Sequence, residues 1–144
     1  MNFPETPIIW CVPRQHHAFA EAEAARRSIE KLAFPEANWD GYGALPVSKE
    51  AKANALRALT RLETTAPFPA VSPNPNGTLS FEWETEFGIG QLEIGRTRYS
   101  FLIKPNIGRA ILHDGPASQI QGFLGAFVDE LLYPKPPRTA LSST

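Results

Sequence analysis

The chain has 144 residues, of which 42% are hydrophobic and 20% are charged, and its formal net charge is −1 at pH 7. This composition is typical of a globular protein rather than a disordered one, and the length suits one domain with its own core. A net charge so close to zero provides no overall attraction for nucleic acid or for an anionic membrane surface.

Cys11 is the only cysteine, so no disulfide can form within the chain, and we expect a reducing, cytoplasmic location. No apolar run approaches the roughly 20 residues that a membrane-spanning helix needs. The apolar segment 8–12 lies between Pro7 and Pro13 and lacks the basic region and the length of a signal peptide. It predicts a strand or arm laid on the domain, and the alternative is an exposed arm that binds a partner.

The segment from His16 to Phe34 is predicted to be a helix that Pro35 ends. Its apolar residues recur at steps of three and four and therefore share one face: Ala18, Ala22, Ala25, Ile29 and Leu32. The pair His16-His17 is a poor metal site, because adjacent residues do not share a helix face and His113 is the only other histidine. We therefore expect no metal and no cofactor.

The most unusual stretch of the chain is Asn38-Trp39-Asp40-Gly41-Tyr42-Gly43-Ala44. Its two glycines permit backbone angles that other residues avoid, and Asp40 signals a turn in which the carboxylate accepts backbone N–H groups. We expect a rigid joint between two helices, with the aromatic side chains of Trp39 and Tyr42 buried in the core. The alternative is an exposed aromatic loop that contacts a partner.

Ser48 is a suitable N-cap for a second helix, which is predicted to run to Glu63. Residues 65–77 contain four prolines and are expected to cross the surface as an extended connector. The pair Asn76-Gly77 then marks a turn into the first strand.

From Thr78 onward the hydrophobic period changes to two, which predicts a four-stranded antiparallel meander over residues 78–113. The predicted strands are 78–84, 88–94, 97–104 and 109–113. A two-residue turn at Gly95-Arg96 fixes a register in which Gly90 lies between Phe81 and Phe101. A side chain at that position would crowd two aromatic rings, which gives a reason for a glycine within a strand.

The predicted inner face of this sheet carries Leu79, Phe81, Trp83, Leu92, Ile94, Tyr99, Phe101, Ile103, Ala110 and Leu112. The outer face is less polar than expected, because Ile89, Leu102 and Ile111 form a row across three neighbouring strands. Such a row is either covered by another element or is a contact site.

Residues 120–132 carry the strongest helical stripe of apolar residues, and we expect this helix to pack on the inner face. Asp114 or Ser118 is its predicted N-cap, and two glycines within it, Gly122 and Gly125, suit a close approach. Two helices followed by strands and one further helix predict the α+β class. The domain is expected to span residues 1–133, with a flexible, proline- and serine-rich tail at 134–144.

The motif at residues 38–44 is followed by Pro46, a helix, the connector Pro69-x-Val71-x-Pro73, Gly77 and a strand ending Phe81-Glu82-Trp83. Over residues 36–103 this pattern resembles a family of small, uncharacterised bacterial and phage proteins with a WDGYGA-type motif and a later strand ending in Glu-Trp. The resemblance implies a mobile-element or host–phage setting. Small proteins of that setting often act as antitoxins, immunity factors or inhibitors of host defence, such as anti-CRISPR proteins.

We therefore expect a non-enzymatic protein-binding module whose partner is a bacterial toxin or a defence-complex subunit. The chain contains no nucleophile, metal or phosphate-binding motif that would indicate an enzyme. The candidate partner-binding residues are Ile89, Leu102, Ile111, Trp39 and Tyr42. One alternative is a small acid–base enzyme that uses Asp40, Glu82 and His113; the other is a nucleic-acid-binding accessory protein. Homodimer formation is left open.

Overall fold

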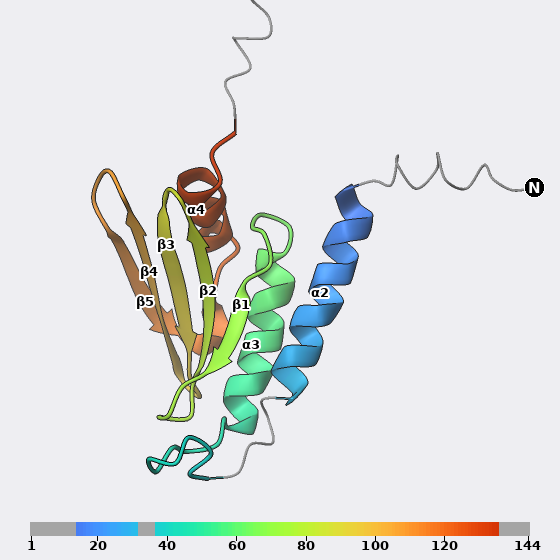
Figure 1. Ribbon diagram of the computed structural model, residues 1–144, viewed down its shortest axis with the longest axis vertical. Coiled ribbons are helices and arrows are strands. Elements are labelled where there is room, and N and C mark those ends of the chain that lie inside the picture. The colour runs from blue at the N-terminus through green and yellow to red at the C-terminus, as the bar shows by residue number, and fades with distance from the viewer. Residues whose placement is uncertain (1–13, 32–36, 136–144) are drawn as a thin grey trace, which may run out of the picture.

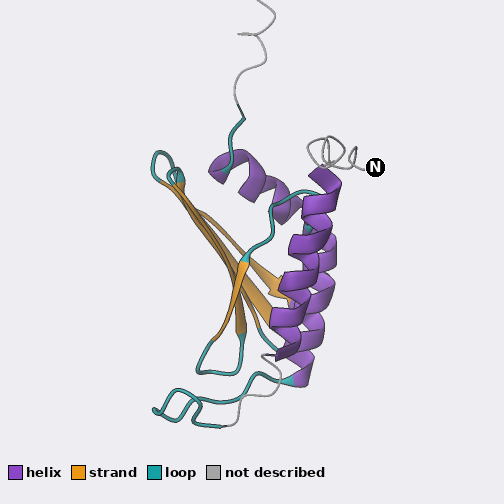
Figure 2. Ribbon diagram, turned by 45° about the vertical axis from the view of Figure 1, so that its right-hand side comes forward, coloured by secondary structure: helices purple, strands orange, loops and turns teal. Residues whose placement is uncertain are grey.

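The protein forms one antiparallel sheet that carries its helices on a single face (Figures 1 and 2). The computed structural model describes residues 14–31 and 37–135. The helices are α2 (Arg14–Lys31), α3 (Lys49–Leu62) and α4 (Phe123–Leu132), with a short 3-10 helix, η1, at Ala117–Gln119. The strands are β1 (Ala70–Pro73), β2 (Leu79–Thr85), β3 (Gly88–Ile94), β4 (Arg98–Pro105) and β5 (Ile111–Pro116), and they are neighbours in that order. The α+β class predicted from the sequence is confirmed.

Helix α3 begins where the sequence predicts. The Ser48 side chain accepts a hydrogen bond from the backbone N–H of Ala51 at 3.0 Å, which satisfies a donor that the first helical turn leaves free. Helix α2 lies alongside α3 (Figure 1), and an ion pair with an N–O distance of 2.7 Å joins Arg26 to Glu63 at the end of α3. Each of these two side chains is about one-third exposed, so the pair contributes at most about 1 kcal/mol.

Three expectations concern residues outside the described ranges. They are the strand or arm at 8–12, the end of the first helix at Pro35 and the tail at 134–144, of which only residues 134 and 135 are described.

The prediction of four strands is wrong by one, because part of the proline-rich connector joins the sheet. Residues 70–73 form β1 and pair antiparallel with β2, from Ala70 opposite Glu82 to Pro73 opposite Leu79. Proline is tolerated here because β1 is an edge strand among the described residues, so its outer side has no ladder to another described strand. The connector is extended as predicted, but its middle is a fifth strand.

The predicted side-chain faces of β2, β3 and β4 are right, whereas the predicted register is wrong by two residues. Leu92 lies opposite Phe81 and Phe101, two positions away from its predicted partner on each side. The β3–β4 turn lies one residue later than expected, because a 2.9 Å hydrogen bond from the Gly95 N–H to the Arg98 carbonyl closes it around residues 96 and 97. A shift of two residues preserves the faces because side chains alternate along a strand.

Gly90 consequently lies between Trp83 and Ile103 rather than between the two phenylalanines expected. A Cβ atom at this position would lie 3.0 Å from Cδ1 of Leu132 in α4 and 3.5 Å from the Trp83 ring. Crowding explains the glycine, as predicted, but the crowding comes from different side chains and from the helix above.

The predicted phase of the last strand is wrong. Ile111 pairs with Ile103 and packs against the core, whereas Leu112 pairs with Leu102 on the outer face and is 75% exposed. Ala110, predicted to be on the inner face, precedes β5 and is exposed. The connection from β4 is longer than predicted, so the pairing of β5 with β4 starts later in the chain. Because this shifts the register of β5 by an odd number of residues, every side chain of β5 moves to the opposite face.

The predicted N-cap of the last helix is also wrong. Asp114 belongs to β5 and Ser118 to η1, and α4 begins at Phe123 after Gly122, without a side-chain cap. The close approach predicted for the glycines of this helix is confirmed at Gly125, where a Cβ atom would collide with the hydroxyl of Thr65.

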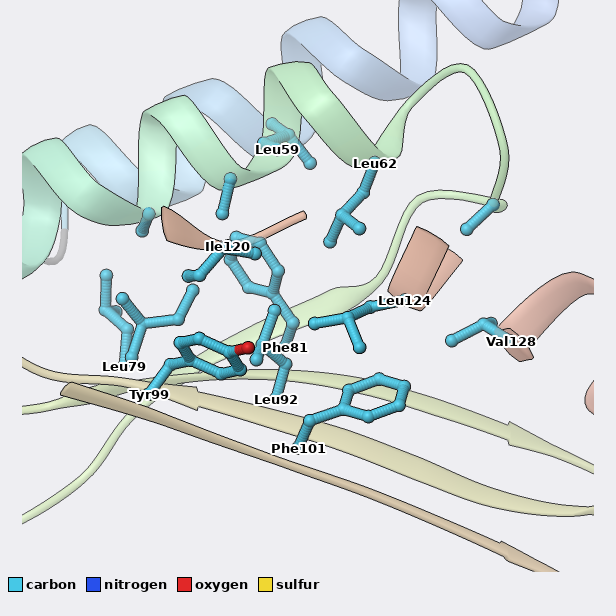
Figure 3. Packing of buried hydrophobic residues seen from close by; sticks show 14 of the residues in the cluster. Leu59, Leu62, Leu79, Phe81, Leu92, Tyr99, Phe101, Ile120, Leu124 and Val128 are labelled. Carbon is cyan, nitrogen blue, oxygen red and sulfur yellow. The ribbon is translucent and has the colours of Figure 1, made fainter. Parts of the chain in front are cut away.

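The core lies between the inner face of the sheet and the helices (Figure 3). Helices α3 and α4 contact β2 and β3, while α2 contacts β1 and α3. The largest fully buried side chains are Phe81, Phe101, Ile29, Leu59, Leu62, Leu79, Leu92, Ile94, Ile103, Ile120, Leu124 and Leu132. In Figure 2, where the sheet is seen nearly edge-on, all three α-helices lie on the same side of it.

Candidate functional site

The loop at residues 38–44 is held closed by its own hydrogen bonds. The Asp40 carboxylate accepts the backbone N–H groups of Tyr42 at 2.9 Å and Ala44 at 3.1 Å, as the sequence predicts. Asn38 closes the loop from the other end, because its side-chain oxygen accepts the Gly43 N–H and its own N–H donates to the Ala44 carbonyl. These bonds define one compact turn structure.

Three residues of this loop have positive φ angles: Asn38 at 63°, Gly41 at 81° and Gly43 at 86°. Glycine adopts such angles without strain, and asparagine does so more readily than other residues. A Cβ atom on Gly41 or Gly43 would have no neighbour within 4 Å, so backbone conformation rather than lack of space requires these glycines.

The loop is attached to the β1–β2 connection. The Leu45 N–H donates to the Pro75 carbonyl at 2.7 Å, and the Trp39 indole N–H donates to the Leu45 carbonyl at 2.9 Å. Trp39 is only half-buried and Tyr42 is 91% exposed, so the predicted burial of both aromatics is wrong for Tyr42 and overstated for Trp39. The geometry matches the alternative, an exposed aromatic loop.

The second candidate region is an apolar patch on the outer face of the sheet. It consists of Ile89 on β3, Leu102 on β4 and Leu112 on β5, and we call it the outer-face patch. Ile89 is 43% exposed, Leu112 is 75% exposed and Leu102 is half-buried. Ile89 and Leu102 face outward as predicted, but they do not form the predicted row, because Gln91 lies opposite Leu102 and Ile89 lies opposite Lys104. Ile111, the third predicted member, faces the core and is replaced by Leu112. None of the described helices lies on this face (Figure 2).

Polar groups and two hollows border the outer-face patch. A hollow of about 230 Å³ is lined by Gln91, Glu93, Ser100, Phe101, Leu102, Leu112, His113 and Asp114. A second hollow of about 390 Å³ is lined by Thr78, Glu93, Gly95, Arg98, Tyr99, Ser100 and Asp114. The two hollows share Glu93, Ser100 and Asp114, so they adjoin along one side of the patch.

One ion pair and two hydrogen bonds hold charged groups at this border. Arg98 pairs with Asp114 across β4 and β5 at 3.0 Å, in a pair that is largely exposed. The Glu93 carboxylate accepts the Thr78 hydroxyl at 2.7 Å and the Asn76 amide at 3.1 Å. The border therefore offers fixed acceptors and donors around an apolar centre.

An aromatic cluster lies beside β5 on the inner side of the sheet. The Tyr99 hydroxyl is 2.8 Å from Nδ1 of His113, whose ring meets Phe123 edge-on at 5.4 Å, and Phe123 in turn meets Phe127 at 6.0 Å. Burial raises the pKa of Tyr99, and the negative charge of Asp114 adds to this rise, while Arg98 opposes it.

The acid–base set proposed as an alternative is not brought together. Asp40 lies in the 38–44 loop, Glu82 lies on the outer face of β2, and His113 lies opposite Phe101 on β5. Three strand spacings separate β2 from β5, which amounts to roughly 14 Å. No group of three or more His, Cys, Asp or Glu side chains suited to a metal ion occurs among the described residues.

Sequence reasoning missed two exposed apolar side chains near β5, Leu112 and Phe123. One signal was available: Pro116 and Gly115 end a strand here. Gly115 lies on the inner face, where its missing side chain makes room for the Tyr99 ring. Because every second residue of a strand faces the same side, His113 and Ile111 then also face inward.

Comparison with protein-family models, with curated proteins and with solved structures found no match to this chain. Over the described part of the chain, none of the helices combines the length and the apolar character needed to cross a bilayer.

Proposed function

We propose that this protein is a non-enzymatic binding module of a bacterial mobile element or phage, which inhibits or neutralises a protein partner through the outer face of its sheet. The toxins and defence-complex subunits suggested by the resemblance over residues 36–103 are the proposed class of partner. The observation that carries the proposal is the outer-face patch of Ile89, Leu102 and Leu112, on a face that no described helix covers.

The composition of this face supports a protein partner. Interfaces between proteins combine an apolar centre with a polar rim, and the outer-face patch has this arrangement, with Gln91 and Ser100 beside it. When a partner covers large apolar side chains on a sheet surface, the complex is stabilised by about 25 cal/mol for each Å² of apolar area buried. Ile89 and Leu112, at 43% and 75% exposure, retain much of this area for a partner.

The charges of the outer face favour a protein over nucleic acid. Its ionisable residues are Glu82, Glu84, Glu93, Arg98, Lys104 and Asp114. Their sum is −2, from two positive and four negative groups, and a phosphate backbone would be repelled by such a surface.

The 38–44 loop offers a second contact. Tyr42 extends into solvent from a turn whose backbone is fixed by hydrogen bonds on both sides of it. Because a tyrosine on a fixed loop loses little conformational freedom on binding, it is an efficient contact residue in protein interfaces.

The proposal is tested by affinity capture from the native host with three tagged variants. Leu102→Glu and Leu102→Lys place either sign of charge in the middle of the patch, next to the neutral Gln91 and Leu112. Ile107→Glu is the matched control, because Ile107 is 92% exposed in the β4–β5 turn, outside the patch.

We expect the wild type and Ile107→Glu to retain the same protein, identified by mass spectrometry, and both Leu102 variants to lose it. Circular dichroism must show that the variants keep their fold. Retention of that partner by both folded Leu102 variants would disprove a binding site on the outer face.

A further inference from the structure

The two edges of the sheet differ in how well they are protected from pairing with a further strand. Edge strand β1 is four residues long, contains Pro73 and is contacted by α2. Edge strand β5, at the other side in Figure 1, has no described element beside its free edge. An open strand edge with unpaired N–H and C=O groups is a template for another strand.

The backbone groups that β5 presents to this open side can be identified. The Ala117 N–H donates to the Thr97 carbonyl at 2.8 Å, so this pair is of the hydrogen-bonded type. Hydrogen-bonded and non-hydrogen-bonded pairs alternate along an antiparallel ladder. It follows that Leu112 and Asp114, at non-hydrogen-bonded positions opposite β4, direct their N–H and C=O groups away from the sheet. Among the described residues, no hydrogen bond satisfies these groups.

We infer that β5 pairs antiparallel with β5 of a second copy of this chain, on a two-fold axis at Leu112. This arrangement joins two five-stranded sheets into one. It sets Leu112 opposite the same residue of the other copy, and Ala110 opposite Asp114. The inference does not depend on the partner proposed above, because it uses the edge of the sheet rather than its outer face.

The charges and the apolar area at this edge favour pairing with a second copy about this axis. An axis at Asp114 would bring two carboxylates together, and an axis at His113 would set Leu112 against a carboxylate. The axis at Leu112 separates the two Asp114 side chains by four residues along the strands and sets each opposite the small, uncharged Ala110 of the other copy. It also buries Leu112 against its counterpart and makes the outer-face patch continuous across both copies.

The inner side of β5 fits the same axis. Phe123 is 46% exposed and lies 5.4 Å from the His113 ring. The pairing sets His113 opposite Ile111 of the second copy, so the exposed Phe123 ring gains apolar neighbours. Both exposed apolar side chains that flank the edge, Leu112 and Phe123, are covered by one arrangement.

The first test measures the mass of the full chain in solution. Sedimentation equilibrium should give twice the chain mass of 15.9 kDa at micromolar concentration. Asp114→Pro removes an outward N–H but no backbone bond to β4, so it should weaken the dimer about tenfold or more while circular dichroism shows a preserved fold. Its loss of the exposed ion pair with Arg98 is shared by the control below. Asp114→Ala is the matched control, which keeps the N–H and should change the dissociation constant only about threefold or less.

The second test uses cross-linking and does not require Asp114→Pro to fold. In a Cys11→Ala background, Leu112→Cys should form a disulfide between copies on mild oxidation. Cα atoms of a hydrogen-bonded antiparallel pair lie about 5.5 Å apart, within the range of a disulfide. Asp114→Cys should not cross-link, because the two positions are four residues apart along the strands, roughly 14 Å.

A chain that remains monomeric at all concentrations would overturn the inference, whether β5 is then free or paired with another protein or with another segment of this chain. A dimer that is unaffected by Asp114→Pro, or that cross-links at residue 114 and not at residue 112, would overturn it as well.

Discussion

Gly125 offers a sharp test of how α4 sits against the rest of the fold. It is within a ten-residue helix, where replacement of glycine by alanine normally stabilises a protein by about 0.8–1.0 kcal/mol. In this structure the added Cβ atom would collide with the Thr65 hydroxyl and lie 3.3 Å from Cβ of Ala66. Helix propensity and packing therefore predict opposite signs for Gly125→Ala.

The packing effect should be the larger one. The Thr65 hydroxyl is held 3.1 Å from the Gly122 carbonyl and 3.3 Å from the Leu62 carbonyl, so moving it away sacrifices hydrogen bonds. Inserting a methyl group into such a contact costs about 1–3 kcal/mol. With the gain in propensity subtracted, Gly125→Ala should lower the free energy of unfolding by about 1 kcal/mol, and the melting temperature by roughly 2–5 °C.

Urea unfolding followed by circular dichroism measures this change, and Thr65→Ala provides the matched background. Without the hydroxyl, the nearest obstacles to the new methyl group are carbon atoms at 3.3 Å, so the cost of Gly125→Ala should fall by about 1 kcal/mol in the double-mutant cycle. A Gly125→Ala protein that is more stable than the wild type would refute the packing of α4 beside the end of α3. The assignment of all helices to the inner side of the sheet would then lose support.

Three further predictions concern the 38–44 loop, the β3–β4 turn and the aromatic cluster. Tyr42→Ala should change the free energy of unfolding by less than about 0.5 kcal/mol, because the side chain is 91% exposed; a larger loss on urea unfolding would contradict the exposed loop. Asn54→Ala should cost about 1–3 kcal/mol in the same assay, because this buried amide donates to the Gly95 carbonyl at 3.0 Å. The pKa of Tyr99 is raised, so the folded state holds the tyrosine proton more tightly than the unfolded state does. The contribution of Tyr99 to the free energy of unfolding is therefore complete below about pH 10 and is lost as the pH rises above that value. Tyr99→Phe should therefore lose less stability than the wild type between about pH 9 and 11, and an equal loss in both proteins would contradict this cause.

The faces of β2, β3 and β4 could be predicted from the sequence because alternation survives a change of register. Phe81, Leu92 and Phe101 are buried on one face although each is opposite a different partner from the one predicted. The register itself depends on which two residues form the β3–β4 turn, and Gly95 can stand either within that turn or in the pair that closes it.

The phase of β5 and the existence of β1 could not be predicted by the same reasoning. Ile111 and Leu112 are both apolar, so alternation cannot decide which of them faces the core; the length of the preceding connection decides it. Pro73 indicates a break in regular structure, yet an edge strand tolerates proline where a central strand does not.

The predicted burial of Tyr42 is wrong for a conformational reason. Composition favours a buried aromatic, but two positive φ angles, at Gly41 and Gly43, reverse the backbone on either side of Tyr42. The turn is closed by the Asp40 carboxylate and by Asn38, and none of these hydrogen bonds involves the core. The outer-face positions of Ile89 and Leu102 were thus predicted correctly, whereas those of Leu112 and Tyr42 depend on backbone geometry that composition does not encode.

The most direct test of the central claim is the affinity of the captured partner for Leu102→Glu and for Ile107→Glu, measured by isothermal titration calorimetry. If the outer-face patch is the centre of the interface, Leu102→Glu should weaken binding by about 2 kcal/mol or more, roughly 30-fold, at an unchanged fold. Ile107→Glu should bind within about threefold of the wild type, since a change of 0.6 kcal/mol or less is typical of residues outside an interface. Wild-type affinity of a folded Leu102→Glu protein would contradict the account, because the outer face would then be free of the partner.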